Sequence, residues 1–402
     1  MKNNLIKRLS LSITGALLIL TAGTAQATVQ KLTAKERTAN DWFGQSVSLS
    51  ADGRTALIGA FGDNNMAGAA YVFIRAANGT WIEEVKLTAP EKIPEHSFGY
   101  RVALSGNGRT ALIHALYNTP RVYLFRRTAK GRWQPEAQWE GGSHTQPLAL
   151  SADGNTAVIS SIKKTPLIYT RSAKGKWSRQ AELSEECAAG FGASFALSAN
   201  GQTLLVGATG DSLQAGRAYI FEHSPDGRWV RQQYLLSASD PALNDGFGLS
   251  VSLNAGGDTA MIAAGGRDLN NNRAESVYIF QFATGDVDEY SYSDWFQRAK
   301  LQLPDIIGPS EIWTIPFAFS ADGGTILTGN NGDGDNRPVY LFTGSGENWT
   351  QQELPPPADA GEARFGWSVS LSANGRTALI GAPDAGAYVF TGLVRPSSTP
   401  GP

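Results

Sequence analysis

The stretch 43–60, FGQSVSLSADGRTALIGA, decides the fold because it recurs along the chain. Close copies are FGYRVALSGNGRTALIHA (98–115), FGASFALSANGQTLLVGA (191–208), FGLSVSLNAGGDTAMIAA (247–264) and FGWSVSLSANGRTALIGA (365–382). Two more divergent copies, PLALSADGNTAVISS (147–161) and PFAFSADGGTILTGN (316–330), bring the total to seven. A repeat roughly 50 residues long is typical of proteins built from one supersecondary unit used many times.

Each copy predicts a β-hairpin. In the first copy, two alternating runs, 46–49 and 55–58, flank the pair Asp52-Gly53. Asn-Gly, Asp-Gly and Gly-Gly pairs accept the positive φ of a tight turn. Every copy has such a pair, so we expect strands A and B to be antiparallel neighbours.

Two further strands follow in each repeat. Strand C carries a Tyr-x-Phe pattern such as Tyr71 to Phe73, which the third copy replaces with Leu167 to Tyr169. A tryptophan such as Trp81 opens strand D, and we expect these large rings to fill the wedge between neighbouring units. Four antiparallel strands per repeat, arranged radially, predict the blade of a β-propeller.

The seventh copy ends without a tryptophan-led fourth strand. The segment VQKLTA at 29–34 matches VKLTA at 85–89, the strand D of the first repeat. We therefore predict an all-β, seven-bladed β-propeller of four-stranded antiparallel blades, in which an N-terminal strand completes the last blade and closes the ring. Such closure removes an open sheet edge.

These repeats resemble the FG-GAP repeat family, the seven-bladed propellers related to the integrin α-subunit head and common in exported bacterial proteins. The last copy carries the family name in its residues, from Phe365-Gly366 to Gly381-Ala382-Pro383. The resemblance covers nearly the whole chain after the N-terminal segment. It implies the fold and leaves the activity open, because propellers host binding and catalysis alike.

The N-terminal segment predicts export. Residues 1–27 combine early basic residues, a short apolar run and the sequence Ala25-Gln26-Ala27, which together indicate a cleaved signal peptide. We expect a propeller over 28–394, a Pro/Ser-rich tail over 395–402, and a periplasmic or extracellular location. No other stretch is apolar enough to predict a membrane span.

Composition excludes several classes of function. The chain has 34 Lys and Arg against 36 Asp and Glu, a balance that argues against nucleic-acid binding. Its one cysteine, Cys187, excludes an intrachain disulfide and lies beside glutamates that disfavour a reactive thiolate. The sequence also lacks Ser-His-Asp order, HExxH, P-loop and GxSxG elements, so we predict no catalytic residue. We expect a monomer.

We expect no cofactor. Many members of the family carry a D-x-D-x-D-G calcium loop between strands A and B, but here that turn has at most one carboxylate, and calcium needs six to eight oxygens. The cluster 330–336, with Asp333 and Asp335, is a weak metal candidate because it partly imitates a calcium loop without the bidentate Glu. An ordinary polar turn is the preferred interpretation.

The family resemblance implies that the loops between strands B and C share a ligand-binding rim with the links between blades. These loops vary most in length, as binding loops on a rigid scaffold do, although neutral divergence explains the variation equally well. The ligand-binding candidates on this rim are Asp63, Asn64, His114, Tyr117, Asp211, Arg217, Arg267, Asp268, Arg273, Asp333, Asp335, Arg337 and Asp384, with Lys163 and Lys164 beside them.

His114 replaces a glycine near the end of strand B, where it would face the channel mouth or record only a local substitution. The acidic and aromatic hairpin 285–294 predicts either a protein-contact ridge or a solvated extension. The leading hypothesis is an exported, non-catalytic propeller that binds a protein or a cell-surface glycan through its rim. The alternatives are a hydrolase or lyase acting on a polysaccharide at the channel mouth, and a purely structural envelope or adhesion component.

Overall fold

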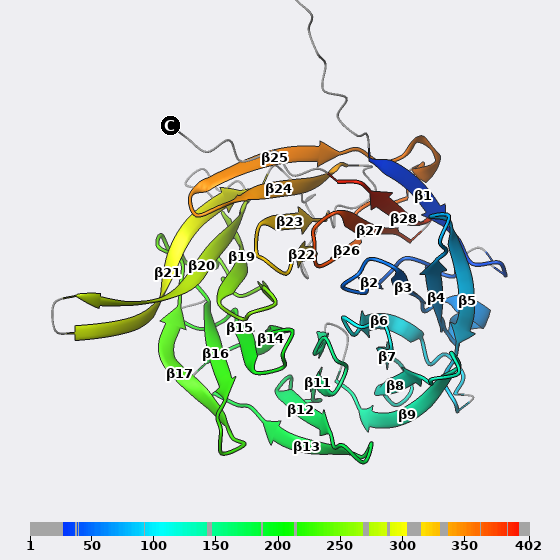
Figure 1. The fold of residues 1–402 in the computed structure, drawn as a ribbon, viewed down its shortest axis with the longest axis horizontal. Coiled ribbons are helices and arrows are strands. Elements are labelled where there is room, and N and C mark those ends of the chain that lie inside the picture. The colour runs from blue at the N-terminus through cyan, green and yellow to red at the C-terminus, as the bar shows by residue number, and fades with distance from the viewer. Residues whose placement is uncertain are drawn as a thin grey trace, which may run out of the picture.

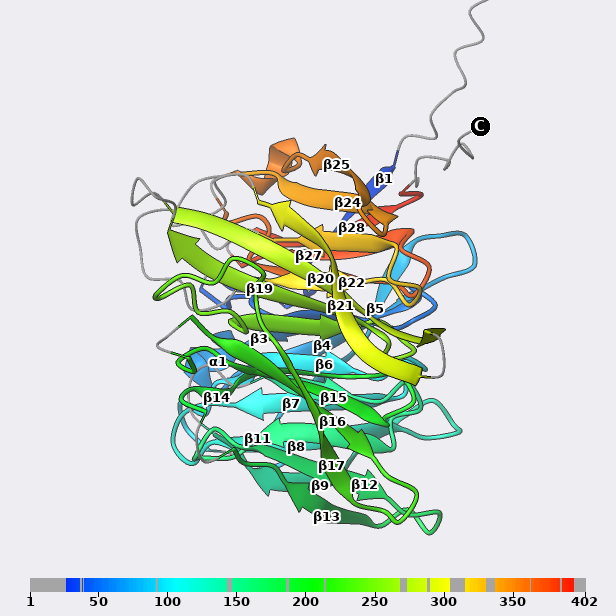
Figure 2. The same cartoon turned by 90° about the vertical axis from the view of Figure 1, so that its left-hand side faces the viewer.

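The computed structural model describes residues 27–393 except 37, 39, 92, 143–146, 186–187, 213–214, 268–272, 288–289, 304–314, 330–336, 362 and 384. In this part of the chain, seven four-stranded antiparallel sheets surround a central axis (Figure 1). Viewed from the side, the blades form one layer of inclined strands (Figure 2). The predicted signal peptide, apart from Ala27, the tail, and Cys187 lie outside the described residues.

The first three blades follow one another in chain order. Each runs from an inner strand A to an outer strand D, as the repeat predicts. Their strands are β2 (Val47–Leu49), β3 (Thr55–Ala60), β4 (Ala69–Arg75) and β5 (Trp81–Leu87) in blade one; β6 (Phe98–Leu104), β7 (Thr110–Ala115), β8 (Arg121–Arg127) and β9 (Trp133–Glu140) in blade two; and β10 (Leu148–Leu150), β11 (Thr156–Ser160), β12 (Pro166–Arg171) and β13 (Trp177–Glu182) in blade three.

The remaining blades repeat this order, and blade five has much longer outer strands. The strands are β14 (Phe191–Leu197), β15 (Thr203–Ala208), β16 (Arg217–His223) and β17 (Trp229–Leu236) in blade four; β18 (Ser250–Leu253), β19 (Thr259–Arg267), β20 (Arg273–Val287) and β21 (Tyr290–Gln302) in blade five; β22 (Phe317–Phe319), β23 (Thr325–Thr328), β24 (Val339–Ser345) and β25 (Asn348–Leu354) in blade six; and β26 (Ser368–Leu371), β27 (Thr377–Ala382) and β28 (Gly386–Thr391) in blade seven. The β20–β21 hairpin projects away from the ring (Figure 1).

The N-terminal strand closes the ring as predicted. β1 (Thr28–Leu32) pairs antiparallel with β28, with Thr28 opposite Thr391 and Leu32 opposite Ala387. Leu32 is buried in a core that also holds Val389 of blade seven and Phe43 of blade one. The predicted fold class is therefore confirmed, including its closure.

The A–B turns form a ring at one end of the central channel. In the first turn, Gly53 has φ +67°, and the Ser50 hydroxyl accepts a hydrogen bond from the Thr55 N–H at 2.9 Å. Backbone N–H groups then join each turn to the next blade at 2.8–3.1 Å, through Ala51 to Gly106, Asn107 to Ala152, Ala152 to Ala199, Ala199 to Ala255, Ala255 to Ala321, Ala321 to Ala373 and Ala373 to Ala51. These seven bonds return to their starting blade, so the turns lock the blades together.

The blades pack through their faces. Among the described residues there are seven clusters of buried apolar side chains, and each joins one neighbouring pair of blades. Strand D tryptophans contribute at the outer radius: the Trp133 indole donates to Glu84 of blade one at 3.1 Å, and the Trp177 indole donates to Glu136 of blade two at 2.9 Å. The expectation that these rings lie between blades is confirmed at both positions.

Two families of glycine allow the backbones of adjacent blades to touch. Gly99, in the Phe-Gly pair that opens blade two, has φ +94°, and its carbonyl oxygen lies 2.0 Å from where a Cβ on Gly59 of blade one would stand. Only glycine fits both positions. The Phe-Gly and Gly-Ala pairs of the repeat are thus the two halves of one contact between blades.

Candidate functional site

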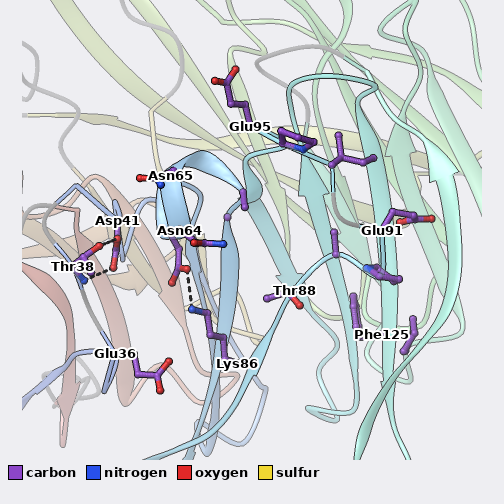
Figure 3. A pocket seen from close by; sticks show the side chains of 18 residues that line it. Glu36, Thr38, Asp41, Asn64, Asn65, Lys86, Thr88, Glu91, Glu95 and Phe125 are labelled. Atoms are coloured by element: carbon purple, nitrogen blue, oxygen red, sulfur yellow. Dashed lines mark hydrogen bonds and ion pairs between the residues drawn. The ribbon is translucent and has the colours of Figure 1, made fainter.

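A large cleft opens on the rim that carries the B–C loops and the links between blades, at the junction of blades one and two. Its cavity volume is about 1210 Å³. The lining comes from the approach to blade one, the B–C loop that contains the short element α1 (Asp63–Met66), the link from β5 to β6, and the outer strands of blade two (Figure 3). The two residues of this cleft named from the sequence are Asp63 and Asn64.

Asp63 lies at the base of the cleft and is buried there. The Lys86 ammonium lies 2.8 Å from its carboxylate, and the Tyr71 hydroxyl donates to the same group. Lys86 is opposite Tyr71 in the β4–β5 register and lies over its ring, 5.5 Å from the centroid. Burial, together with the Asp63 carboxylate, raises the pKa of Tyr71 and keeps the phenol protonated.

Two loops border this base, one with a buried carboxylate and one with exposed amides. Asp41 is buried and accepts hydrogen bonds from the backbone N–H of Thr38, at 2.6 Å, and from the Thr38 hydroxyl (Figure 3). On the B–C loop, Asn64 and Asn65 have φ near +50° and are exposed. Asparagine accepts this left-handed conformation better than most residues, so the loop presents two amide side chains to solvent.

Three more acids complete the cleft, of which Glu36 and Glu95 are exposed and Glu91 is half-buried. Glu36 lies on one side of the opening and Glu91 on the other, with Lys86 between them (Figure 3). Although burial raises the pKa of Glu91, hydrogen bonds from Gln138 and Tyr123 hold it below its usual value. With Glu95 on the linking segment, the described lining carries five carboxylates and one ammonium. The cleft is therefore acidic and favours a positively charged group.

The Tyr, Lys and Asp arrangement recurs in two other blades. In blade five, Asp240 accepts from the Tyr278 hydroxyl at 2.9 Å and from the Lys300 ammonium at 2.6 Å. In blade seven, Lys31 lies over the Tyr388 ring and 3.3 Å from the Asp359 carboxylate. Since three blades share this arrangement, its basic role is to fasten strands C and D to a loop, and the cleft adds exposed acids to that common base.

The other rim candidates are spread around the ring. In blade four, Asp211 is buried, accepts from the Tyr219 hydroxyl, and lies 3.9 Å from the Arg217 guanidinium. Tyr117, in blade two, is 41% exposed, and its carbonyl oxygen is 3.0 Å from a ring nitrogen of the buried His96. The structure does not bring these side chains together with the acidic cleft.

The remaining candidates belong to blades five, six and seven. Arg267 and Arg273 are opposite one another in the last pair of the β19–β20 ladder, and Arg337 is half-buried before β24. Asp268, Asp333, Asp335 and Asp384 lie outside the described residues.

His114 lies inside the fold rather than on the rim surface. It is buried, its Nε2 is 3.1 Å from the Gly142 carbonyl oxygen, and its ring meets Tyr100 edge-on. The sequence explains why this blade tolerates a histidine where others have glycine: blade three lacks the Phe-Gly pair whose carbonyl fills the equivalent space elsewhere. Sequence reasoning identified the exception and missed its structural cause.

Sequence reasoning also missed most of the cleft. Glu36, Asp41, Glu91 and Glu95 come from two links between blades, 32–44 and 87–99, which have equal length and carry Glu36 and Glu91 at the same position. Lys86 also left a signal, since Lys31 and Lys300 likewise precede a leucine in strand D. A cross-strand comparison with the strand C tyrosines would have revealed the pairing.

The A–B turn carboxylates cap their own turns. The Asp52 carboxylate accepts from the Ser50 hydroxyl and the Arg54 N–H, and Asp153 does the same in blade three. Within the described ranges, no group of three or more His, Cys, Asp or Glu side chains is placed to hold a metal ion. The same ranges contain no helix long and apolar enough to cross a membrane.

The central channel has a different lining. Its cavity of about 230 Å³ is bordered by strand A residues from all seven blades. The described side chains on it include Phe195, Phe317, Trp367, several serines and one charged residue, Arg101, and none of them is Asp or Glu.

Comparison with known proteins agrees with this architecture. The FG-GAP repeat model matches residues 27–73 and 229–280. The β-propeller domain of Myceliophteria thermophila Cps50 (Swd1) is similar in structure, with a TM-score of 0.59 and 13% identity over 91% of this chain and 100% of that chain. No curated protein matches the chain. The chain is therefore a seven-bladed β-propeller with FG-GAP repeats at the two matched places.

Proposed function

We propose that this protein is an exported, non-catalytic binding propeller that recognises a protein or a cell-surface glycan through its B–C loop rim. The ligand-binding site in this proposal is the acidic cleft between blades one and two. The observation that carries this proposal is the excess of carboxylates in a cleft of about 1210 Å³. The cleft exceeds the size of most small-molecule sites and suits an extended segment of a larger partner.

The cleft charges define the ligand chemistry. Asp63 is already paired with Lys86, and Asp41 with its own loop, so both hold the cleft in shape. Glu36 and Glu95 are exposed on its borders. Exposed carboxylates attract and orient cationic groups with little need to rearrange. The ligand segment is therefore basic: lysine- or arginine-rich if a protein, or bearing free amino groups if a glycan.

Calorimetric titration with two cationic probes tests this assignment. Tetralysine stands for the protein ligand and a glucosamine tetramer for the glycan, each compared with its N-acetylated, uncharged form. Glu36→Gln and Glu95→Gln are each expected to weaken binding of the preferred cationic probe about two- to five-fold, the value of an exposed charge pair. Glu347→Gln removes the same charge from the C–D hairpin of blade six at the opposite rim. It should leave the affinity for the cationic probe unchanged.

The preferred probe decides between the two ligand classes. Stronger binding of tetralysine indicates a protein ligand, and stronger binding of the glucosamine tetramer indicates a glycan. The proposal is wrong if neither cationic probe binds, or if Glu36→Gln, Glu95→Gln and Glu347→Gln weaken binding equally.

A further inference from the structure

The central channel contains one charged side chain in a ring of otherwise neutral positions. The position occupied by Arg101 in blade two is serine in blades one, four, five and seven and proline in blades three and six. All seven of these residues line the channel, namely Ser46, Arg101, Pro147, Ser194, Ser250, Pro316 and Ser368. The exceptional residue is thus the only cation facing the axis at this level.

The serines at this level serve the scaffold. The Ser46 hydroxyl accepts from the Val102 N–H at 3.0 Å, and the Ser194 and Ser368 hydroxyls donate to carbonyl oxygens of the next blade. The Arg101 side chain makes no hydrogen bond or ion pair with any described residue, and its guanidinium lies 5.8 Å from the Tyr100 ring centroid. The scaffold therefore uses serine here, and arginine adds a charge that the fold does not use.

The surroundings of Arg101 leave its charge uncompensated. Burial lowers the pKa of Arg101, and no carboxylate lines the described part of the channel. Arg101 is half-buried, so its charge is partly removed from water at a cost in free energy, and an anion in the channel recovers part of that cost. A guanidinium also matches the two oxygens of a carboxylate or phosphate better than any other side chain.

We propose that the channel binds a small oxyanion ligand, with its carboxylate or phosphate on Arg101 and an apolar body against the aromatic side chains of the lining. Phe317 and Trp367, both half-buried, supply that apolar surface. A cavity of about 230 Å³ lies below the size of a drug-binding pocket and admits a molecule of about one ring. The lining residues stand at the start of each strand A, the end remote from the A–B turns and next to the rim.

This site is distinct from the acidic cleft and takes a ligand of the opposite charge. The cleft is bordered by links and outer strands of blades one and two, whereas the channel is bordered by strand A of every blade. The two assignments can therefore fail separately. Cationic probes report on the cleft, and anionic probes report on the channel.

The test is calorimetric titration with benzoate and phenyl phosphate, with benzamide as the neutral counterpart. The full protein is expected to bind at least one oxyanion saturably and benzamide at least tenfold more weakly. Arg101→Ser should weaken oxyanion binding at least tenfold, and Arg101→Lys should fall between because it keeps the charge without the planar fork. Arg109→Gln, at the exposed A–B turn of the same blade, is the matched charge control.

A folding control keeps the result interpretable. Because Arg101→Ser installs the residue of four other blades, its unfolding midpoint in urea should equal or exceed that of the parent. Tighter binding of benzoate than of phenyl phosphate indicates a carboxylate ligand, and the reverse order indicates a phosphate ligand. The proposal is overturned if neither oxyanion binds, or if a folded Arg101→Ser protein binds them as tightly as the parent does.

Discussion

Ala373 of the last blade donates its backbone N–H to the carbonyl oxygen of Ala51 in the first blade, at 2.9 Å. The two residues are at opposite ends of the repeat series, and their bond completes the ring of turns around the channel. At the outer radius, β1 closes the same junction by pairing with β28. The break in the chain thus lies inside blade seven, between β28 and β1, and the first and last blades are joined at the inner edge by the turn bond and at the outer edge through β1.

Closure by β1 predicts an asymmetry within one short strand. Leu32 is 2% exposed and Val29 is 45% exposed. Leu32→Ala should lower the free energy of unfolding by about 2–4 kcal/mol, because it leaves a cavity in the core between blades seven and one. Val29→Ala should cost less than about 0.5 kcal/mol. Urea denaturation measures both, and equal effects of the two substitutions would contradict docking of this strand in solution.

The turn ring predicts that glycine is needed for space as well as for conformation. Gly154 has φ +69°, and a Cβ there would stand 2.3 Å from the Thr110 hydroxyl of the preceding blade. Gly227, in the C–D hairpin of blade four, has φ +85° and no atom within 4 Å of such a Cβ. In both alanine variants a residue with a Cβ has to adopt the left-handed backbone conformation, which costs about 1–2 kcal/mol.

Gly154→Ala should lose about 1–3 kcal/mol more than Gly227→Ala, because only the former overpacks a blade junction. Equilibrium unfolding of the two variants in parallel isolates this difference. Similar losses in both would show that backbone conformation alone explains the turn glycines.

The repetition of these turns explains how much of the fold the sequence predicts. Strands A to D, the Asp-Gly and Asn-Gly turns and the closing strand all arise from patterns that recur, so each copy supports the others. The tryptophans follow the same logic, because one position per blade fills the same wedge. Repetition also makes exceptions visible: His114 was identified as a departure from a glycine, whereas Arg101, a departure from a serine, was not singled out before the structure placed it in the channel.

The candidate site is predictable only in part, for a physical reason. Asp63 and Asn64 were found because B–C loops occur once per repeat. Glu36 and Glu91 occupy the same position of the equal-length links 32–44 and 87–99, so a comparison of the links would have found both. Glu95 and Asp41 have no acidic counterpart in the other link, and no repeat predicts that they line the same cleft.

The Tyr, Lys and Asp arrangements predict a loss of stability in alkaline solution. Burial raises the pKa of Tyr278 to about 12, with the Lys300 hydrogen bond opposing this rise and the Asp240 hydrogen bond adding to it. A tyrosine in an unfolded chain has a pKa of about 10. Because the folded value is higher, the stabilisation is fully present below pH of about 10 and is lost as the pH rises toward 12.

Absorbance at the tyrosinate band, followed together with circular dichroism, measures this loss. Tyr278→Phe removes the ionisable group while keeping the ring, and it should make the stability between pH of about 10 and 12 less sensitive to pH. Tyr117→Phe is the matched control because Tyr117 is 41% exposed. Identical pH dependence in the two variants would show that the buried phenol does not govern alkaline stability.

The central claim is that the rim with the acidic cleft binds and the opposite rim does not. Calorimetric titration of tetralysine and the glucosamine tetramer into Glu36→Gln/Glu95→Gln and into Glu347→Gln tests it most directly. The account predicts that the double variant loses about fivefold or more in affinity for the preferred probe and shows a smaller salt dependence, whereas Glu347→Gln matches the parent. Equal affinity in all three proteins, or no binding of either cationic probe to the parent, would contradict it.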